Sequence, residues 1–187
     1  MWVFLALIAA VAVQRLWELR RSRRNEARLR AQGGREHARA QMPWMTLLHA
    51  SWLFAMPLEI LLLRRPFHVG LAVAAGIVFL VGQSLRIAAM RALGDRWCVR
   101  VFTLPGAPAI DHGVFRVVRH PNYLGVVLEI AALPLVHGAW LTALVWSTAN
   151  AVLLTFRIRA EEAALQTDND YQADLGDRPR FVPRLPI

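Results

Sequence analysis

Long apolar runs alternate with arginine-rich segments along this chain. Most of the runs approach the ~20 residues with which a helix crosses a bilayer, although some are shorter. They predict about five membrane-spanning helices, over 1–16, 44–63, 67–90, 123–136 and 140–156. We therefore expect an all-α integral membrane protein that ends in a helical hairpin.

Composition supports the membrane location and raises one competing class. Hydrophobic residues make up 56% of the chain, and the net charge of +9 comes from arginine because there is no lysine. Arginine clusters can bind nucleic acid. Here they flank apolar runs, which is typical of the cytoplasmic ends of membrane helices, so we expect no nucleic acid partner. Cys98 is the only cysteine, which excludes an intrachain disulfide.

The first apolar run is interpreted as a retained membrane anchor, because basic residues follow it rather than precede it. These residues are Arg15, Arg20, Arg21, Arg23 and Arg24. Basic residues also gather in two segments expected to be loops, 18–41 and 91–119, and in the tail, whereas the opposite turns, 64–66 and 137–139, are short. The positive-inside rule then predicts an inner-membrane protein with its N-terminus outside and the basic segments and C-terminus in the cytoplasm.

The most informative polar motif is Arg119-His120-Pro121-Asn122-Tyr123-Leu124-Gly125, at the start of the fourth apolar run. Proline is favoured at the first position of a helix, so we expect a helix to begin at Pro121. Its free amides and positive dipole end would face an anion. The motif therefore predicts an anchor for the charged part of a cofactor at the membrane surface.

The last two runs predict a hairpin with its turn near Gly138. Antiparallel pairing about this turn would bring Arg157 level with Arg119 and His120. Arg157 and Glu161 share one helical face at i,i+4, and Glu162 follows. Alone, such a pair is usually a solvated ion pair at a membrane boundary. Beside His120 it would complete a site suited to a zwitterionic, cationic cofactor.

The same hairpin register would place Glu129 opposite Ser147 and within reach of Asn150, about 12 Å along the helix from Pro121. A carboxyl group at that depth is costly unless it is hydrogen-bonded or protonated. Glu129 is therefore either a functional residue or a structural link between two helices.

These motifs carry a resemblance to a known family. The 119–125 motif, followed by Arg157-x-x-x-Glu161-Glu162 and Tyr171, resembles the signature of the isoprenylcysteine carboxyl methyltransferase family over roughly the last half of the chain, 93–186. The N-terminal half resembles a bacterial branch that O-methylates the alkylpyrones or alkylresorcinols made by type III polyketide synthases. Residues that carry this second likeness include Arg15, Leu16, Glu18, Leu19, Arg24, Asn25, Glu26, His49, Glu59, Arg180 and Phe181.

The resemblance implies an S-adenosylmethionine-dependent methyltransferase that receives its cofactor from the cytoplasm and its lipid from the bilayer. The cofactor-binding residues that it implies are His112, Gly113, Val114, Arg119, His120, Pro121, Tyr123 and Gly125. Arg157, Glu161 and Glu162 would close the reaction pocket. Phe115 stands where the family usually has tyrosine and lacks the hydroxyl group, so it is left out of the hydrogen-bonding set. One domain over 1–187 is expected, with membrane helices in 1–92 and the catalytic core in 93–187.

Direct displacement is the expected mechanism, in which a lipid oxygen attacks the sulfonium methyl group in a water-poor site. A prenylcysteine carboxylate needs no base, whereas a phenol with a pKa near 10 gains from one. Glu129 is the candidate proton acceptor, and a phenolic or pyrone polyketide lipid is the first choice of substrate. Isoprenylcysteine carboxylate is the alternative.

Three other functions remain open on the sequence. Membrane sterol reductases carry a very similar Arg-His-Pro-Asn-Tyr turn and use NADPH, and a phospholipid N-methyltransferase would need a site for an amine. A non-enzymatic scaffold would use its basic segments to bind anionic lipid headgroups, which is also the preferred role of the arginines over 20–39. No histidine or cysteine pair has the spacing of metal ligands, so no metal is expected.

His49 and Glu59 lie ten residues apart in the second run, on roughly one helical face. They could reach a lipid cavity, or they could serve in capping or interhelical bonding.

Overall fold

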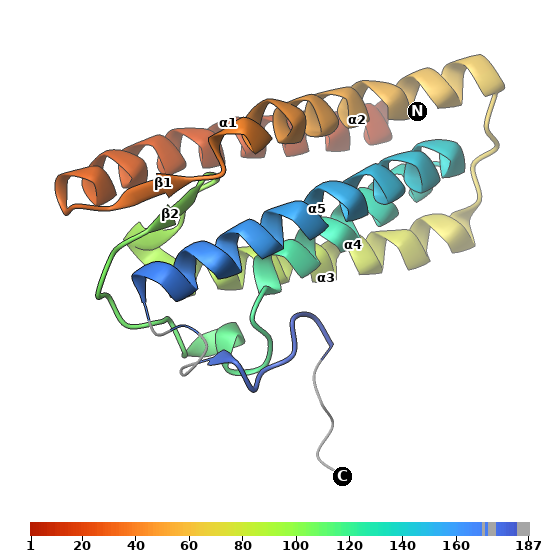
Figure 1. Cartoon of the computed structure of the whole chain (residues 1–187). Coiled ribbons are helices and arrows are strands. Elements are labelled where there is room, and N and C mark those ends of the chain that lie inside the picture. The colour runs from red at the N-terminus through yellow and green to blue at the C-terminus, as the bar shows by residue number, and fades with distance from the viewer. Residues whose placement is uncertain (170, 172–174, 183–187) are drawn as a thin grey trace, which may run out of the picture.

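Five long α-helices run side by side in the computed structural model, which describes residues 1–169, 171 and 175–182. They are α1 (Trp2–Ala31), α2 (Met42–Leu63), α3 (Val69–Leu93), α4 (Pro121–Leu135) and α5 (Trp140–Asp168). α1, α3 and α5 run toward the end of the molecule that carries a small sheet, and α2 and α4 run away from it (Figure 1). The N-terminus therefore lies at the opposite end from the long connecting segments.

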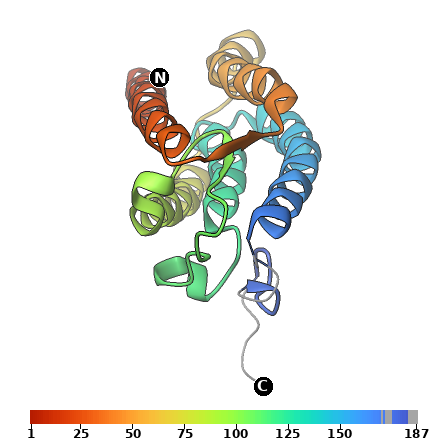
Figure 2. The same ribbon diagram turned by 60° about the vertical axis from the view of Figure 1, so that its left-hand side comes forward.

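Four of these helices, α1, α2, α3 and α5, are long and apolar enough to cross a membrane. Many of their large apolar side chains point outward, including Val3, Phe54, Leu62 and Val73. The chain is thus a multi-pass, all-helical membrane protein, as the sequence predicted. The fourth predicted span is shorter than the others: α4 has 15 residues and lies among its neighbours in the centre of the bundle (Figure 2).

α1 is much longer than its apolar run predicted. The expectation of a basic loop from 18 to 41 is wrong, because α1 continues to Ala31. Residues 17–31 contain no glycine or proline and are rich in leucine, arginine, glutamate and alanine, all good helix formers. The helix ends where Gly33 adopts a φ of +85° and the amide of Gly34 bonds the Leu29 carbonyl at 2.7 Å. α5 likewise passes the predicted end at 156 and reaches Asp168.

The predicted hairpin of α4 and α5 is confirmed, with Gly138 at a φ of +76° in its turn. α4 also packs tightly on α3, where Gly82 and Gly125 face each other. A Cβ atom on Gly125 would lie 2.7 Å from the Gly82 carbonyl oxygen and would also collide with the side chain of Arg86. The two glycines therefore permit the close approach that buries α4.

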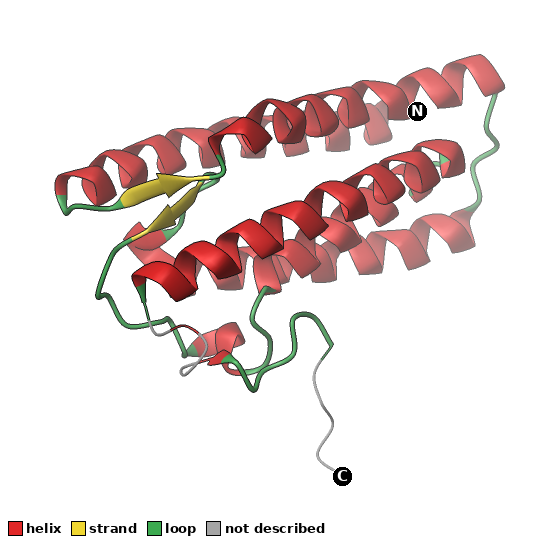
Figure 3. Cartoon of the chain, in the orientation of Figure 1, coloured by secondary structure: helices red, strands yellow, loops and turns green. Residues whose placement is uncertain are grey.

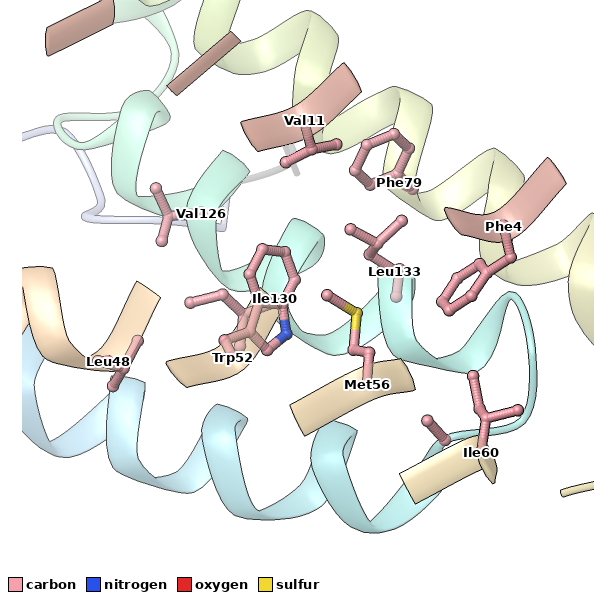
Figure 4. Close-up of a cluster of buried hydrophobic side chains, with 12 residues drawn as sticks. Phe4, Val11, Leu48, Trp52, Met56, Ile60, Phe79, Val126, Ile130 and Leu133 are labelled. Carbon is pink, nitrogen blue, oxygen red and sulfur yellow. The ribbon is translucent and has the colours of Figure 1, made fainter. Parts of the chain in front are cut away.

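A hydrophobic cluster joins four helices around α4 (Figure 4). Its members include Trp52 and Met56 of α2 and Ile130 and Leu133 of α4. All four side chains are essentially inaccessible to solvent. Phe4 and Val11 of α1 and Phe79 of α3 complete it. Lipid tails are as apolar as these side chains, so close packing rather than removal from water holds the helices together here.

A two-stranded antiparallel sheet closes one end of the bundle (Figure 3). It pairs β1 (Arg35–His37) with β2 (Val101–Thr103), so that Glu36 lies opposite Phe102. Three short 3₁₀ helices lie at the same end, η1 (Arg39–Gln41), η2 (Gly94–Arg96) and η3 (Gly113–Arg116). No pattern in the sequence predicts this sheet, because each strand has three residues and the partners are more than sixty positions apart.

Two carboxylates fasten the sheet to the helices. Glu36 accepts hydrogen bonds from Arg30 of α1 and Arg100, and it pairs with Arg39 at 3.1 Å. Asp168 is the last residue of α5. It pairs with Arg35 at 2.8 Å and with His37 at 3.3 Å, and it accepts a hydrogen bond from the Thr103 hydroxyl group.

Glu59 acts at the opposite end of the bundle as a cap for α5. Its carboxylate accepts hydrogen bonds from the amides of Leu141 and Thr142 and from the Thr142 hydroxyl group, and it pairs with Arg65 at 2.9 Å. The capping role is therefore the one that the structure supports for this residue.

Candidate active site

One cavity of about 560 Å³ runs from the sheet end of the bundle into its membrane-spanning part. Its walls come from all five long helices and from the segments 96–110 and 119–123. Apolar side chains such as Leu53, Val126 and Leu154 line the inner part. This volume is in the range that binds cofactors and drug-sized ligands.

The start of α4 forms one wall of the cavity. Pro121 occupies the first turn of the helix, and no side chain in the described part of the chain caps the free amides there. His120, directly before it, bonds through Nε2 to Glu162 Oε1 at 3.0 Å. Glu162 also receives two hydrogen bonds from Arg180, at 3.0 and 2.6 Å, and lies 3.5 Å from Arg119. Glu162 therefore ties the His120 turn to α5 and to the C-terminal segment.

The C-terminal segment holds the same turn through its backbone. The amide of Arg119 donates to the carbonyl of Pro179 at 2.9 Å, and the amide of His120 donates to the carbonyl of Arg180 at 3.1 Å. Arg178 donates to the Phe115 carbonyl at 2.7 Å. The closing motif at 183–186 lies outside the described residues.

Arg157, Tyr123 and Glu161 meet at a single phenol oxygen. The Tyr123 hydroxyl donates to Glu161 and accepts from Arg157 Nε at 3.0 Å. Arg157 also donates to the carbonyl of Val99 and is almost fully buried. Arg157 and Glu161 therefore come together through Tyr123 rather than as a direct ion pair, and all three line the cavity.

Several buried polar atoms in the cavity wall have no hydrogen-bond partner among the described residues. At the sheet end they are Trp97 Nε1, Arg119 Nε, Asn122 Oδ1 and Asn169 Oδ1. A buried polar atom without a partner costs roughly 1–3 kcal/mol, so such atoms mark places where a ligand can bind. Together with the uncapped start of α4, they give the sheet end of the cavity the donors and acceptors that a zwitterionic cofactor requires.

A second polar cluster lies deeper, where two arginines and two glutamates from three helices meet. Arg86 of α3 bonds Glu18 at 2.6 Å and Glu129 at 2.9 Å. Arg15 of α1 bonds the same two carboxylates, with Glu18 at 2.7 Å. Arg15, Glu18 and Arg86 line the cavity. The two positive and two negative charges cancel, and their pairing offsets the free-energy cost of burying them between apolar helices.

Comparison with known proteins shows which family the chain belongs to. The model of the isoprenylcysteine carboxyl methyltransferase (ICMT) family matches residues 74–167, which is half of the chain. The chain belongs to the isoprenylcysteine carboxyl methyltransferase family. This assignment covers α3, α4 and most of α5, and it implies a methyltransferase that uses S-adenosylmethionine.

Two bacterial relatives match over nearly their whole lengths. The uncharacterized protein YpbQ of Bacillus subtilis (strain 168) is 36% identical over 165 residues, which cover 88% of this chain and 97% of the relative. An uncharacterized protein of Haemophilus influenzae is 28% identical over 162 residues, or 84% of this chain and 91% of the relative. Both alignments extend well beyond the residues of the family match.

The structure brings about half of the predicted site residues to the cavity. Arg119, His120, Pro121, Tyr123, Arg157 and Glu161 line it. The remaining predicted residues are not among those that line it: His112, Gly113, Val114, Gly125, Glu129 and Glu162. His112 and Gly113 are exposed, Gly125 packs against Arg86, and Glu162 lies behind His120. Phe115, in contrast, is part of the wall.

The structure gives Glu129 two partners that the sequence analysis did not predict. Neither Ser147 nor Asn150 hydrogen-bonds it in the described part of the chain, and Oε2 instead accepts from Arg15 and Arg86. The hairpin register was right, but a pairing drawn from two helices leaves out α1 and α3. The sequence did hold a signal for Arg86, since it stands within a predicted apolar span, where a charged side chain is usually functional.

Many of the arginines that were predicted to bind lipid headgroups have intramolecular partners. Arg28 pairs with Asp95 at 2.8 Å, while Arg30, Arg35 and Arg39 hold the sheet. Arg20, Arg23 and Arg24 are exposed along α1. Binding of anionic lipids stays a prediction, now centred on these three side chains.

Proposed function

We propose that this protein is an S-adenosylmethionine-dependent O-methyltransferase that methylates a hydroxyl group on a membrane lipid, such as an alkylresorcinol or an alkylpyrone. One observation carries the proposal. A single cavity joins the basic, hydrogen-bonding turn at 119–123 to an apolar chamber within the membrane-spanning helices. The cofactor and the lipid head can therefore meet there.

The residues at the sheet end of the cavity fit the cofactor. The free amides at the start of α4 and Arg119 suit its carboxylate, and the side chains of Asn122 and Asn169 offer unpaired oxygens. Phe115 presents an aromatic face to the same space. When bound, S-adenosylmethionine would supply an activated methyl group on a sulfonium sulfur.

The residues between the two ends would align the reaction. Arg157 is fixed by the Val99 carbonyl and by Tyr123, so its guanidinium group has one orientation. Val126 and Leu154 form apolar walls beside it. In this arrangement Arg157 would orient the attacking oxygen, and the apolar walls would exclude water.

The lipid would enter from the bilayer between α1 and α2. These helices stand apart where they flank the cavity (Figure 2), and Leu16, Leu19 and Ala50 are exposed at its rim. A gap lined by apolar side chains suits an acyl chain, and the head of the lipid would then lie beside Arg15 and Arg86.

A carboxylate is a second candidate substrate, because two guanidinium groups at the inner end of the cavity also suit that anion. On this alternative, the protein would methylate the carboxyl group of an isoprenylcysteine. The same geometry does not favour an amine, which would lie against two arginines.

The two candidates are separated by incubating the purified protein in lipid nanodiscs with methyl-labelled cofactor and a lipid panel. The panel contains an alkylresorcinol, an alkylpyrone, a farnesylcysteine and phosphatidylethanolamine, and products are identified by mass spectrometry. We expect labelled O-methyl products from the first two lipids and their loss with Arg157→Lys, which cannot contact both Tyr123 and Val99. Labelling of farnesylcysteine alone would support the carboxylate alternative, and labelling of none would overturn the proposal.

A further inference from the structure

His49 is a titratable side chain in the cavity wall to which the family assignment gives no role. It lies on the face of α2 that lines the cavity, between Met45 and Leu53 one turn away on either side. Its ring is partly buried, and Nδ1 lies 2.8 Å from the carbonyl oxygen of Met45.

This contact fixes the tautomer of the ring. A backbone carbonyl can only accept a hydrogen bond, so Nδ1 of His49 carries the proton and donates it to Met45. In the neutral imidazole, Nε2 is then the nitrogen with the free lone pair. No hydrogen bond to Nε2 comes from the residues that the structure describes. The cavity wall thus presents a pre-oriented proton acceptor.

Two arginines from other helices share the cavity with His49: Arg15 of α1 and Arg157 of α5. Both act on it electrostatically, as does Glu129 of α4. Arg15 Nε is buried and has no partner among the described residues, although the terminal nitrogens bond Glu18 and Glu129. An imidazole acceptor and a guanidinium donor therefore face the same space, as the deprotonation of a hydroxyl group requires.

The two carboxylates of the deep cluster are less suited to this task. Glu129 does not line the cavity, and its Oε2 accepts from both arginines. Glu18 accepts from Arg15, Arg86 and Gln14. A proton on the bonded oxygen of either carboxylate would displace a guanidinium hydrogen bond.

We propose that His49 is the catalytic base that accepts the hydroxyl proton of the lipid, and that Arg15 stabilises the resulting oxyanion. This inference rests on the proposed O-methylation. The O–H bond breaks and its proton moves to Nε2 of His49. An oxygen lone pair forms the new O–CH₃ bond as the S–CH₃ bond breaks, and the electron pair of the broken bond stays on sulfur, which becomes a neutral thioether. The imidazolium then releases its proton to water.

The first test needs no cofactor. A 4-alkyl-2-nitrophenol is a chromogenic lipid probe, because its phenolate absorbs visible light and its phenol does not. Near neutral pH, binding to the wild-type protein should raise the phenolate fraction above that in empty nanodiscs. His49→Asn keeps a donor for the Met45 carbonyl but lacks the acceptor, so the rise should vanish. His68→Asn, at an exposed histidine at the far end of the bundle, is the matched control and should behave as wild type.

The second test is the pH profile of methyl transfer to an alkylresorcinol. His49→Asn should lose about 100-fold in rate at pH 7 and recover most of it near pH 10, where the phenol ionises without a base. Two results would show that His49 only shapes the cavity. One is an equal loss of methyl-transfer rate in His49→Asn at both pH values, and the other is a phenolate fraction in His49→Asn equal to that in wild type. If no lipid is methylated by wild type while the probe still ionises at His49, the proposed function fails and the proton acceptor stands.

Discussion

At the scale of single residues, His120 is the best-fixed side chain of the cofactor end. Its Nε2 bonds Glu162, its amide bonds the C-terminal segment, and its ring lies 5.5 Å from that of Tyr123. Such a ring cannot adjust freely when a ligand binds. His120 holds the start of α4 beside the cavity and forms part of the cavity wall.

His120→Ala should therefore weaken cofactor binding without unfolding the bundle. Hydrogen bonds to charged groups contribute about 1.5–3 kcal/mol, so we expect the Kd of S-adenosylmethionine to rise at least about tenfold. Calorimetric titration of detergent-purified protein measures this, with His68→Ala as the control. An unchanged Kd in a folded His120→Ala protein would show that the cofactor does not bind at this turn.

Cys98 lines the cavity but should be chemically quiet. Burial raises the pKa of its thiol to about 12, and the negative charge of Glu26 acts in the same direction. Only the thiolate reacts with alkylating reagents or with an activated methyl group. Iodoacetamide at pH 8 should label Cys98 on the order of a thousandfold more slowly than free cysteine, with a rate that still rises above pH 10. A rate that levels off near pH 9 would contradict the raised pKa.

Sequence reasoning found the residues whose partners are near in the chain or related by one hairpin. His120, Tyr123, Arg157 and Glu161 follow from a local motif and from a turn at Gly138. Side chains that meet across three helices were beyond it, because no periodicity gives the relative placement of α1 and α3. That is why the two arginine partners of Glu129 were not predicted and the role of His49 was left open.

At the scale of elements, the ends of the helices do not coincide with the ends of the apolar runs. Apolar runs marked the membrane-spanning parts of α1 and α5, but both helices continue for more than ten residues beyond them. Hydropathy indicates whether a segment lies in lipid or in water, and it does not indicate whether the segment is helical. It therefore could not predict these extensions. The helix propensity of residues 17–31 could have done so.

Glu59 offers a test of one such helix end. Glu59→Ala removes the acceptor for two amides of α5 and the partner of Arg65, and it should lower the free energy of unfolding by about 2 kcal/mol. Thermal unfolding in detergent measures the loss. Asp95→Ala, which breaks the exposed pair with Arg28, should change little. Cofactor affinity should be unchanged in both variants, and a fall with Glu59→Ala would mean that this end of the bundle also shapes the site.

At the scale of the whole molecule, the direction of each helix places every long polar segment at one end. The sheet, the 3₁₀ helices and the described C-terminal residues lie together there, and the short turns lie at the other end (Figure 1). The positive-inside rule predicts that this polar end lies in the cytoplasm, where it would meet the proposed cofactor.

This orientation can be measured with single cysteines in a Cys98→Ser background. Gln32→Cys lies after α1 at the polar end, and His68→Cys lies before α3 at the other end. A membrane-impermeant maleimide should label His68→Cys in intact cells and Gln32→Cys only in inverted vesicles. The reverse pattern would place the cavity mouth outside the cell and exclude a cytoplasmic cofactor.

The central claim is that one cavity brings the methyl donor and the lipid into contact. A bisubstrate compound, in which adenosine is joined through sulfur to an alkylresorcinol, tests it directly. Equilibrium displacement should show this compound competing with both labelled S-adenosylmethionine and the nitrophenol probe, with an affinity above that of either alone. Competition with only one of them would show that the two ligands bind apart, and the account of a shared reaction cavity would be wrong.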